Sequence, residues 1–292
     1  MTPYQAFAER VAALFVEHEK IKEVYTLIEA IQTHQGFNAK CKHMFVLGGS
    51  GVGKSKMAEN FVKKYPPTVS IDEDGTEFDI KPVIYVETPH PFTWKELYFS
   101  ILGSLGSARI DGKVGDLKDR AFHLLQAQQV KMVFLDEIHN ILTSTAVSNK
   151  GAMEHLKHMT NLTNVSLVLM GTPEAKVLRD LDDQYKTRYR IKHLKRFEEC
   201  DEEFCSFLDL IEEQLDPPFD IGLGDEESGL PQLLHYMSKG KVGFLIPIIQ
   251  EAYRLNGVFE DDFNDFSKAK LRAADIDRAY KNMVGDEEIE ED

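Results

Sequence analysis

The sequence predicts an α/β fold, in which a five-stranded parallel sheet is sandwiched by helices and followed by a C-terminal helical lid. Three observations predict it. A glycine-rich string follows an apolar run, short apolar runs then alternate with helix-like segments, and after Leu194 only helix-like segments remain. Strands alternating with helices are typical of a parallel sheet covered on both faces. We therefore expect a P-loop core over residues 36–195 and a lid over residues 196–285.

The length, the opening residues and the cysteines bound the class of protein. At 292 residues the chain exceeds one typical domain, which favours a core with a smaller appended unit. No apolar run is long enough to span a bilayer, and residues 1–5 lack the features of a signal peptide. Cys41, Cys200 and Cys205 lack the spacing of a metal site. We expect a cytoplasmic protein with reduced thiols and no membrane partner.

The net charge of −15 is distributed unevenly along the chain. Residues 1–194 carry a net charge of +1, whereas residues 195–292 carry −16. A basic surface on the N-terminal two thirds is therefore compatible with a DNA partner. Residues 286–292 are almost entirely acidic and predict a disordered tail, which either keeps the protein soluble or contacts a basic partner.

Apolar periodicity places the elements in order along the chain. Residues 4–33 predict two helices that precede the first strand and belong to an N-terminal segment, residues 1–35. The five predicted strands are 44–47, 82–87, 130–135, 165–170 and 189–194. Helices are predicted between them at 56–62, 93–105, 117–128 and 150–160, and in the lid at 201–215, 229–237, 242–255 and 267–283.

The glycine-rich string fits G-x-x-x-x-G-K-[ST] at every fixed position and predicts a site for ATP. Glycines let backbone N–H groups close around phosphate oxygens. Lys54 is expected to reach the β and γ phosphates, and the Ser55 hydroxyl to ligate Mg²⁺. The residues expected to contact the nucleotide are Gly48, Gly49, Ser50, Gly51, Val52, Gly53, Lys54, Ser55 and Lys56.

Two acidic residues end the third predicted strand, where a P-loop enzyme needs a carboxylate. We expect Asp136 to hold Mg²⁺ and Glu137 to orient and deprotonate the attacking water. A nucleotide kinase has no need for that second carboxylate, so Glu137 favours hydrolysis of ATP by water. His139 beside them is more typical of a structural hydrogen-bonding group than of a catalyst or metal ligand.

Two further residues are candidates for catalysis. Thr172 follows the fourth strand, at the sheet edge where ligands bind, and either contacts the γ-phosphate or attacking water or caps the next helix. Arg188 ends the segment before the fifth strand, where an arginine can reach a neighbouring subunit's ATP and stabilise the transition state. Arg190 is the alternative candidate for this role, and either arginine could instead form only a surface salt bridge. Activity then requires assembly.

These motifs, taken in order, resemble those of AAA+ ATPases: the phosphate loop, Leu135-Asp136-Glu137-Ile138-His139-Asn140, Gly171-Thr172-Pro173 and Thr187-Arg188-Tyr189. The Asp-Glu-Ile-His-Asn string, the segment 87–91 and the segment 97–106 are similar to the TniB and TnsC branch. That branch contains ATPase regulators of DNA transposition. The resemblance covers roughly residues 10–255, and the phosphate loop alone is shared by many families.

The resemblance implies an oligomer that assembles with ATP on double-stranded DNA as a ring or filament, hexameric or heptameric in number. It also implies that the assembly links a TniQ-like target-selection protein to a transposase and that hydrolysis dismantles it. The family's DNA contacts come from the insert between the second and third strands, here about residues 89–118. They imply Lys95, Arg109 and Lys113 as DNA-binding residues, with Lys150 as a further candidate.

Some features depart from this family or leave alternatives open. Many AAA+ proteins touch the γ-phosphate with a lid arginine, which the segment 239–243 lacks; either Lys241 takes that role or the role is absent. One alternative function is an AAA+ ATPase of replication initiation or of clamp or helicase loading. A nucleotide-dependent scaffold that binds no DNA is another. Gel shifts on random duplex with ATP, with ADP and without nucleotide distinguish these functions.

Overall fold

The computed structural model describes residues 1–33, 42–71, 74–75, 77–109 and 111–285. The predicted tail, residues 286–292, and Cys41 lie outside the described residues. Contacts between Cα atoms divide the chain into two compact units. The sheet unit contains Lys20–Ser50 and Lys54–Leu194, and the helical unit contains Met1–Glu19, Gly51–Gly53 and the chain from Lys195 onward. The boundaries 1–35, 36–195 and 196–285 stay predictions.

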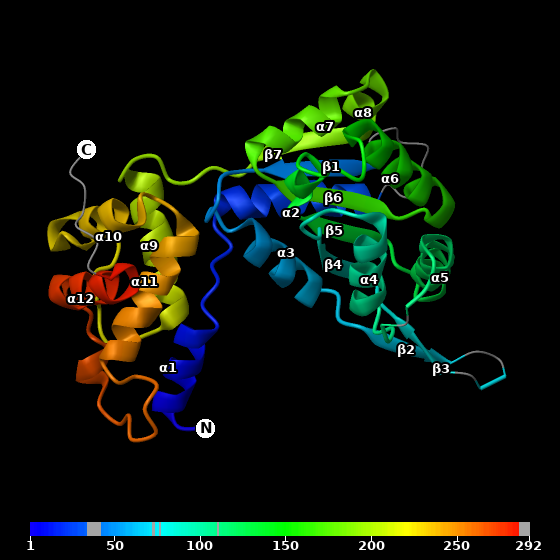
Figure 1. Cartoon of the computed structure of the whole chain (residues 1–292). Coiled ribbons are helices and arrows are strands. Elements are labelled where there is room, and N and C mark those ends of the chain that lie inside the picture. Colours follow the sequence, from blue (N-terminus) through cyan, green and yellow to red (C-terminus); the bar gives the residue numbers. More distant parts are fainter. Residues whose placement is uncertain (34–41, 72–73, 76, 110, 286–292) are drawn as a thin grey trace. The chain divides into compact units, whose positions relative to one another are not determined.

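The sheet unit is built on five parallel strands flanked by helices, as the sequence predicts (Figure 1). The strand order is β4-β5-β6-β1-β7, so β1 lies between β6 and the edge strand β7. Because the strands are parallel, their carboxyl ends lie at one edge of the sheet. The strands are β1 (His43–Leu47), β4 (Val83–Glu87), β5 (Met132–Asp136), β6 (Ser166–Gly171) and β7 (Tyr189–His193).

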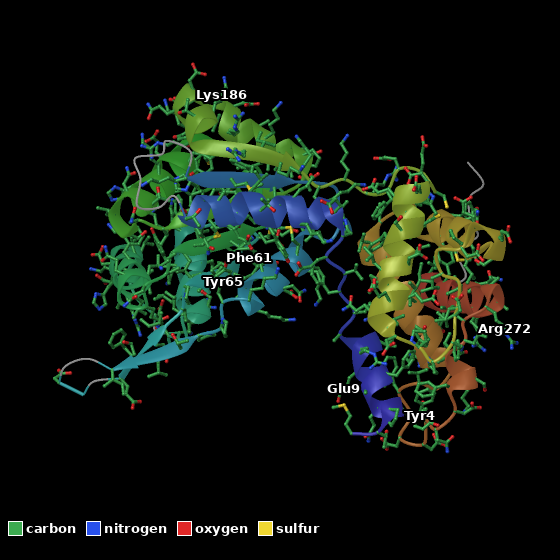
Figure 2. All side chains as sticks on the ribbon, turned by 180° about the vertical axis from the view of Figure 1, so that it is seen from behind. Tyr4, Glu9, Phe61, Tyr65, Lys186 and Arg272 are labelled. Carbon is green, nitrogen blue, oxygen red and sulfur yellow. The ribbon has the colours of Figure 1, made fainter. Side chains whose placement is uncertain are left out.

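Helices cover this sheet and bury its apolar side chains. Residues of β1, β5 and β6 are buried throughout, which matches their continuous apolar sequence. Phe61 of α3 packs against Phe134 of β5 and Tyr65, with ring centroids 5.5 and 5.2 Å apart (Figure 2). The helices are α2 (Glu19–Thr33), α3 (Lys54–Lys63), α4 (Trp94–Ser104), α5 (Val114–Ala127), α6 (Asn149–Thr163), α7 (Lys176–Asp180) and α8 (Asp183–Arg188).

A short antiparallel hairpin joins α3 to β4 and was not predicted. Its strands are β2 (Thr68–Ile71) and β3 (Glu77–Ile80). Val69 and Ile71 are 62 and 64% exposed, and they lie opposite Asp79 and Glu77 in the register. The apolar residues are few and the segment is rich in acidic residues, so periodicity alone does not mark it as a strand pair.

The helical unit has its own apolar core. Aromatic rings join α1 to α11, where Phe7 meets Tyr253 with centroids 5.4 Å apart. The last predicted helix, 267–283, was wrong at its start: a 3₁₀ turn over Phe266–Ala269 comes first, and Lys270 is extended. The helices of this unit are α1 (Pro3–Ala12), α9 (Glu202–Leu215), α10 (Leu230–Ser238), α11 (Val242–Leu255) and α12 (Ala273–Val284). No described helix has the length and apolar character needed to cross a membrane.

Candidate functional site

The phosphate loop lies between the end of β1 and the start of α3. Gly51 and Gly53 have φ values of 77° and 94°, a region that side chains with a Cβ rarely adopt. The backbone N–H of Gly48 donates to the carbonyl of Gly171, 3.0 Å away, so the loop starts beside the end of β6. This strand–loop–helix arrangement is the local structure that a phosphate-binding string requires.

Lys54 is held inside the loop by backbone oxygens. Its side chain is buried, and Nζ donates to the carbonyls of Gly48 and Gly49 at 2.8 and 2.9 Å. Burial lowers the pKa of Lys54, whereas the nearby carboxylates of Asp136 and Glu137 act to raise it. The ammonium therefore lies at the loop with its position fixed by hydrogen bonds, where a phosphate chain would lie.

The structure brings Ser55 and Asp136 together. The Ser55 hydroxyl donates to Asp136 Oδ2 at 2.5 Å, and Asp136 is 1% exposed. The Tyr85 hydroxyl of β4 donates to the same oxygen at 2.9 Å, while the Glu137 N–H donates to Oδ1 at 2.8 Å. The two hydroxyls and the N–H fix the orientation of the carboxylate.

This donor set fits Mg²⁺ bound together with a nucleotide. Hydroxyl and carboxylate oxygens are the ligands that Mg²⁺ prefers, and the ion is usually held by one or two carboxylates plus substrate phosphates. Among the described residues, no group of three or more His, Cys, Asp or Glu side chains is placed to hold a metal alone. A magnesium ion held here by Ser55 and Asp136 would take its remaining ligands from phosphate oxygens and water.

Tyr85 is a residue of this site that the sequence motifs do not indicate. It lies on β4 opposite Phe134 of β5, and the next pair in the register with the same orientation joins Glu87 to Asp136. Diagonal neighbours across a pair of strands are within reach of long side chains. The alternation in β4 was visible in the sequence, but the register that places Tyr85 beside Asp136 was not.

Glu137 follows β5 in a left-handed backbone conformation. Its φ and ψ are 53° and 35°, which costs a residue other than glycine about 1–2 kcal/mol. Its carboxylate Oε2 lies 3.1 Å from Nε2 of His139. Strained backbone of this kind is concentrated at functional sites. Among the described residues, the buried Nδ1 of His139 has no hydrogen-bond partner, and the structural role of His139 stays a prediction.

Thr172 follows β6 and precedes a 3₁₀ turn, η3 (Pro173–Ala175). Its hydroxyl does not cap that turn; it bonds to the carboxylate of Glu174 and thereby lowers the pKa of Glu174. Gly171 before it lies against η2 (Ile138–Ile141), and a Cβ there would come within 3.1 Å of Ile138 and 3.3 Å of His139. The ends of β5 and β6 are therefore in close contact.

Arg188 lies at the other end of the strands. It ends α8, and the next residue, Tyr189, pairs with His43 at the start of β1. From His43 to Gly48 the strand rises about 16 Å at ~3.3 Å per residue. Arg188 therefore does not reach the phosphate loop of its own chain. Its guanidinium donates to Asn161 Oδ1 at 3.3 Å, and Arg190 is exposed on β7.

The four candidate DNA-binding residues differ in their surroundings. Lys95 pairs with Asp111 at 2.6 Å. Arg109 pairs with Glu96 at 3.1 Å and lies 4.3 Å over the ring of Phe99. The other two residues, Lys113 just before α5 and Lys150 in the first turn of α6, are exposed, and no ion pair is found for them within the described part of the chain. Lys241, the candidate lid residue, directly precedes α11.

A family model described as "Bacterial TniB protein" matches residues 8–199 of the chain. The match includes the phosphate loop, Asp136, Glu137, Thr172 and Arg188. Among curated proteins, none matches this sequence.

Several solved structures have a similar fold. The ORC2 protein of Aeropyrum pernix, solved as ADPNP-ADP complexes, has a TM-score of 0.60 at 13% identity, over 88% of this chain and 67% of that one. The ORC1 protein of Aeropyrum pernix in complex with DNA has a TM-score of 0.58 at 16% identity, over 92% and 66%. Domain III of the replication initiation protein DnaA from Thermotoga maritima has a TM-score of 0.51 at 14% identity, over 89% and 92%.

These similarities establish the fold. The expected architecture, a five-stranded parallel sheet flanked by helices and followed by C-terminal helices, is confirmed. This chain spans about two thirds of the length of the two archaeal proteins. At 13–16% identity the similarity establishes the fold and does not establish an activity or a partner.

Proposed function

We propose that this chain, which belongs to the TniB family, is an ATPase that assembles with ATP on double-stranded DNA and regulates transposition. The observation that carries the proposal is the cluster at the carboxyl ends of β1 and β5. Lys54, Ser55 and Asp136 lie together there, and Glu137 follows with a carboxylate that a phosphate-binding protein without hydrolysis does not need.

In this proposal the side chains divide the chemistry of ATP hydrolysis. The phosphate-loop residues from Gly48 to Lys56 bind the phosphates, and Ser55 and Asp136 hold Mg²⁺, which neutralises charge on the phosphates when bound. Glu137 orients the attacking water and accepts its proton, and Thr172 contacts the γ-phosphate or that water. His139 holds the Glu137 carboxylate on one side.

Assembly completes the site in the same proposal. Arg188 lies too far from its own phosphate loop to act there, so a neighbouring subunit supplies it to the transition state. The lid, residues 196–285, and Lys241 report the nucleotide state. The assembled cytoplasmic protein joins a TniQ-like target selector to a transposase, and hydrolysis of ATP to ADP releases the subunits. Its form is a ring or filament of this one chain.

DNA binding is proposed through phosphate contacts, which are sequence-independent and sensitive to salt. The ORC1 structure similar to this chain was solved with DNA, and Drosophila ORC bound to DNA is also similar, with a TM-score of 0.57 at 12% identity. Lys113 and Lys150 are the more available cations, whereas Lys95 and Arg109 must first leave a carboxylate. The same likeness favours replication initiation or clamp or helicase loading as the second candidate function.

The test is a gel shift on random duplex with the full chain, in ATP, in ADP and without nucleotide. Stable complexes in ATP alone are expected, and hydrolysis should increase when duplex is added. A matched series with the Lys54→Ala variant should show no ATP-dependent complex. Duplex binding that does not depend on the nucleotide would falsify the ATP-dependent switch. A complete absence of duplex binding would leave a nucleotide-dependent scaffold that binds no DNA.

A further inference from the structure

A cavity of about 670 Å³ lies in the sheet unit, at the amino ends of β1 and β7. This is the end of the strands opposite the phosphate loop. Its volume is in the range of ordinary ligand sites. The cavity is lined by Lys42, His43, Thr160, Asn161, Asn164, Val165, Gln184, Thr187 and Arg188.

The described residues of the lining carry positive charge and no carboxylate. Lys42 and Arg188 are its two cations, and within the described ranges neither forms an ion pair. Other cations of the same region do pair: Lys186 lies 2.8 Å from Asp183, and Lys157 lies 3.3 Å from Glu154. The cavity therefore brings together two cations that have no carboxylate partner among the described residues, which is the electrostatic character of an anion site.

His43 forms a neutral part of the wall. Its Nδ1 accepts a hydrogen bond from the backbone N–H of Leu167 at 3.1 Å, and it is 5% exposed. Burial, assisted by the charge of Arg188, lowers the pKa of His43 to about 3. Among the described lining residues, the charge at neutral pH therefore comes from Lys42 and Arg188.

The donors that remain for a ligand are nitrogen groups. The hydroxyls of Thr160 and Thr187 donate to helix carbonyls at 2.9 Å, so they are already engaged. Asn161 accepts from the Arg188 guanidinium through its oxygen, which holds the guanidinium at the cavity. An ammonium, a guanidinium and side-chain amides are the groups that bind phosphate oxygens through charge-assisted hydrogen bonds.

We propose that this cavity is a second phosphate-binding site of the chain, in which Lys42 and Arg188 together bind phosphate oxygens. The phosphate belongs either to ATP held in a neighbouring subunit's loop or to a free phosphate compound. The first source rests on the proposed function, because it requires assembly. In both cases Lys42 supplies a second positive charge beside Arg188 that the sequence reading did not identify.

The first arm of the test measures ATP hydrolysis by the full chain on duplex DNA. Lys42→Ala should lower the rate at least about tenfold, as expected for the loss of one charged transition-state contact, while Lys42→Arg keeps most of it. Binding of a fluorescent ATP analogue by dilute subunits should not change, which also shows that the variant folds. Lys186→Ala is the matched control. Lys186 lies in α8, the helix that Arg188 ends, on its outer side (Figure 2), and it does not line the cavity.

Arg188→Ala provides the reference for this arm. If Arg188→Ala is inactive and Lys42→Ala hydrolyses ATP at the normal rate, the inference about Lys42 is wrong and the proposed function stands. If both variants hydrolyse ATP normally and the Lys54→Ala protein binds no tripolyphosphate in the second arm, the second site is overturned. The gel shift then decides the proposed function separately, because it does not involve these residues.

The second arm tests a free anion. The Lys54→Ala variant, diluted until it is monomeric, is titrated with inorganic tripolyphosphate in a calorimeter. If the Lys54→Ala protein binds tripolyphosphate and the double variant, Lys54→Ala with Lys42→Ala, does not, the ligand is a free phosphate compound. No binding here, together with loss of hydrolysis in the first arm, identifies the neighbour's nucleotide. No effect in either arm overturns the proposal.

Discussion

The two ends of β1 handle charge in different ways. At the carboxyl end, Lys54 is bonded to loop carbonyls, and the carboxylate of Asp136 is bonded to Ser55 and Tyr85. At the amino end, the chain provides Lys42 and Arg188, and no described residue of the cavity carries a carboxylate. The first end is ordered by its own subunit, so it can bind a nucleotide alone. The second end stays short of negative charge until an anion from elsewhere arrives.

The largest effect expected from this difference appears on mixing two inactive variants. Lys54→Ala damages the carboxyl end and Arg188→Ala the amino end, and each alone should lower hydrolysis at least about 10³-fold. In a one-to-one mixture about a quarter of the interfaces combine two intact halves. The rate of hydrolysis should therefore return to about a quarter of that of the unmutated protein. The measurement is phosphate release on duplex DNA.

The control for this mixture joins two variants damaged at the same end. Lys54→Ala mixed with Glu137→Gln leaves no interface with an intact carboxyl end, because every subunit in the mixture is damaged there. It should therefore stay inactive. Recovery in that control, or no recovery in the first mixture, would contradict the division of labour between the two ends.

A second effect isolates the chemical step at the carboxyl end. Glu137→Gln should slow hydrolysis by roughly 10²–10⁴-fold, because the attacking water loses its base. ATP binding should persist, since Lys54 and Ser55 are unchanged, and ATP-bound assemblies should accumulate. Rapid-quench kinetics and electron microscopy of the variant with ATP and duplex measure the two outcomes. Unchanged turnover would remove Glu137 from the mechanism.

A third effect tests how the carboxyl end is ordered. Tyr85→Phe removes one of the two hydroxyls that donate to Asp136 Oδ2. Loss of such an outer partner typically weakens a metal site 10–100-fold, so we expect the Mg²⁺ concentration for half-maximal ATP binding to rise about tenfold. A fluorescent ATP analogue titrated with Mg²⁺ reports it. Tyr65→Phe is the control, and an equal shift there would mean that the hydroxyl of Tyr85 has no special role.

A fourth, smaller effect concerns cations away from both ends of β1. Lys113→Ala and Lys150→Ala should each lower the salt dependence of duplex binding, with the slope of log K against log salt reduced by about 1. Lys95→Ala should change it less, because Lys95 is paired with Asp111 at 2.6 Å. Binding curves at four salt concentrations distinguish these outcomes. Identical slopes for all three variants would place the DNA contacts elsewhere.

The smallest effect concerns folding stability. Glu137→Gly should raise the free energy of unfolding by about 0.5–1 kcal/mol, because glycine tolerates a φ of 53°. Hydrolysis should be lost at the same time. Gln129→Gly is the matched control: Gln129 is exposed and has a φ of 52°, so the same gain is expected with hydrolysis intact. Thermal unfolding of both variants measures the gain, and a loss of stability in Glu137→Gly alone would show that the carboxylate supports the fold.

The sequence predicted the carboxyl end of β1 better than the amino end, for a physical reason. A phosphate loop is contiguous, and Asp136 directly follows an apolar strand, so local patterns reveal both. The contact of Tyr85 with Asp136 depends on the register of β4 against β5. The cavity of Lys42 and Arg188 depends on β7 lying next to β1, which joins segments about 145 residues apart. No local spacing encodes that adjacency.

The β2–β3 hairpin was missed for a related reason. Its apolar residues Val69 and Ile71 are exposed, so they do not mark a strand that packs on a core. The element exists because its two strands pair with each other, over four residues each. Sequence periodicity reports burial more directly than it reports pairing of this kind.

That hairpin also affects how the protein behaves in concentrated solution. An open strand edge that carries exposed Val69 and Ile71 is a template for unwanted pairing between molecules. Glu77 and Asp79 lie opposite Ile71 and Val69 on the partner strand, and their carboxylates oppose this pairing because like charges on two molecules repel each other. Dissolved salt screens that repulsion. At high ionic strength the protein should therefore aggregate through this edge even without nucleotide. Preparations for microscopy are best concentrated at moderate salt.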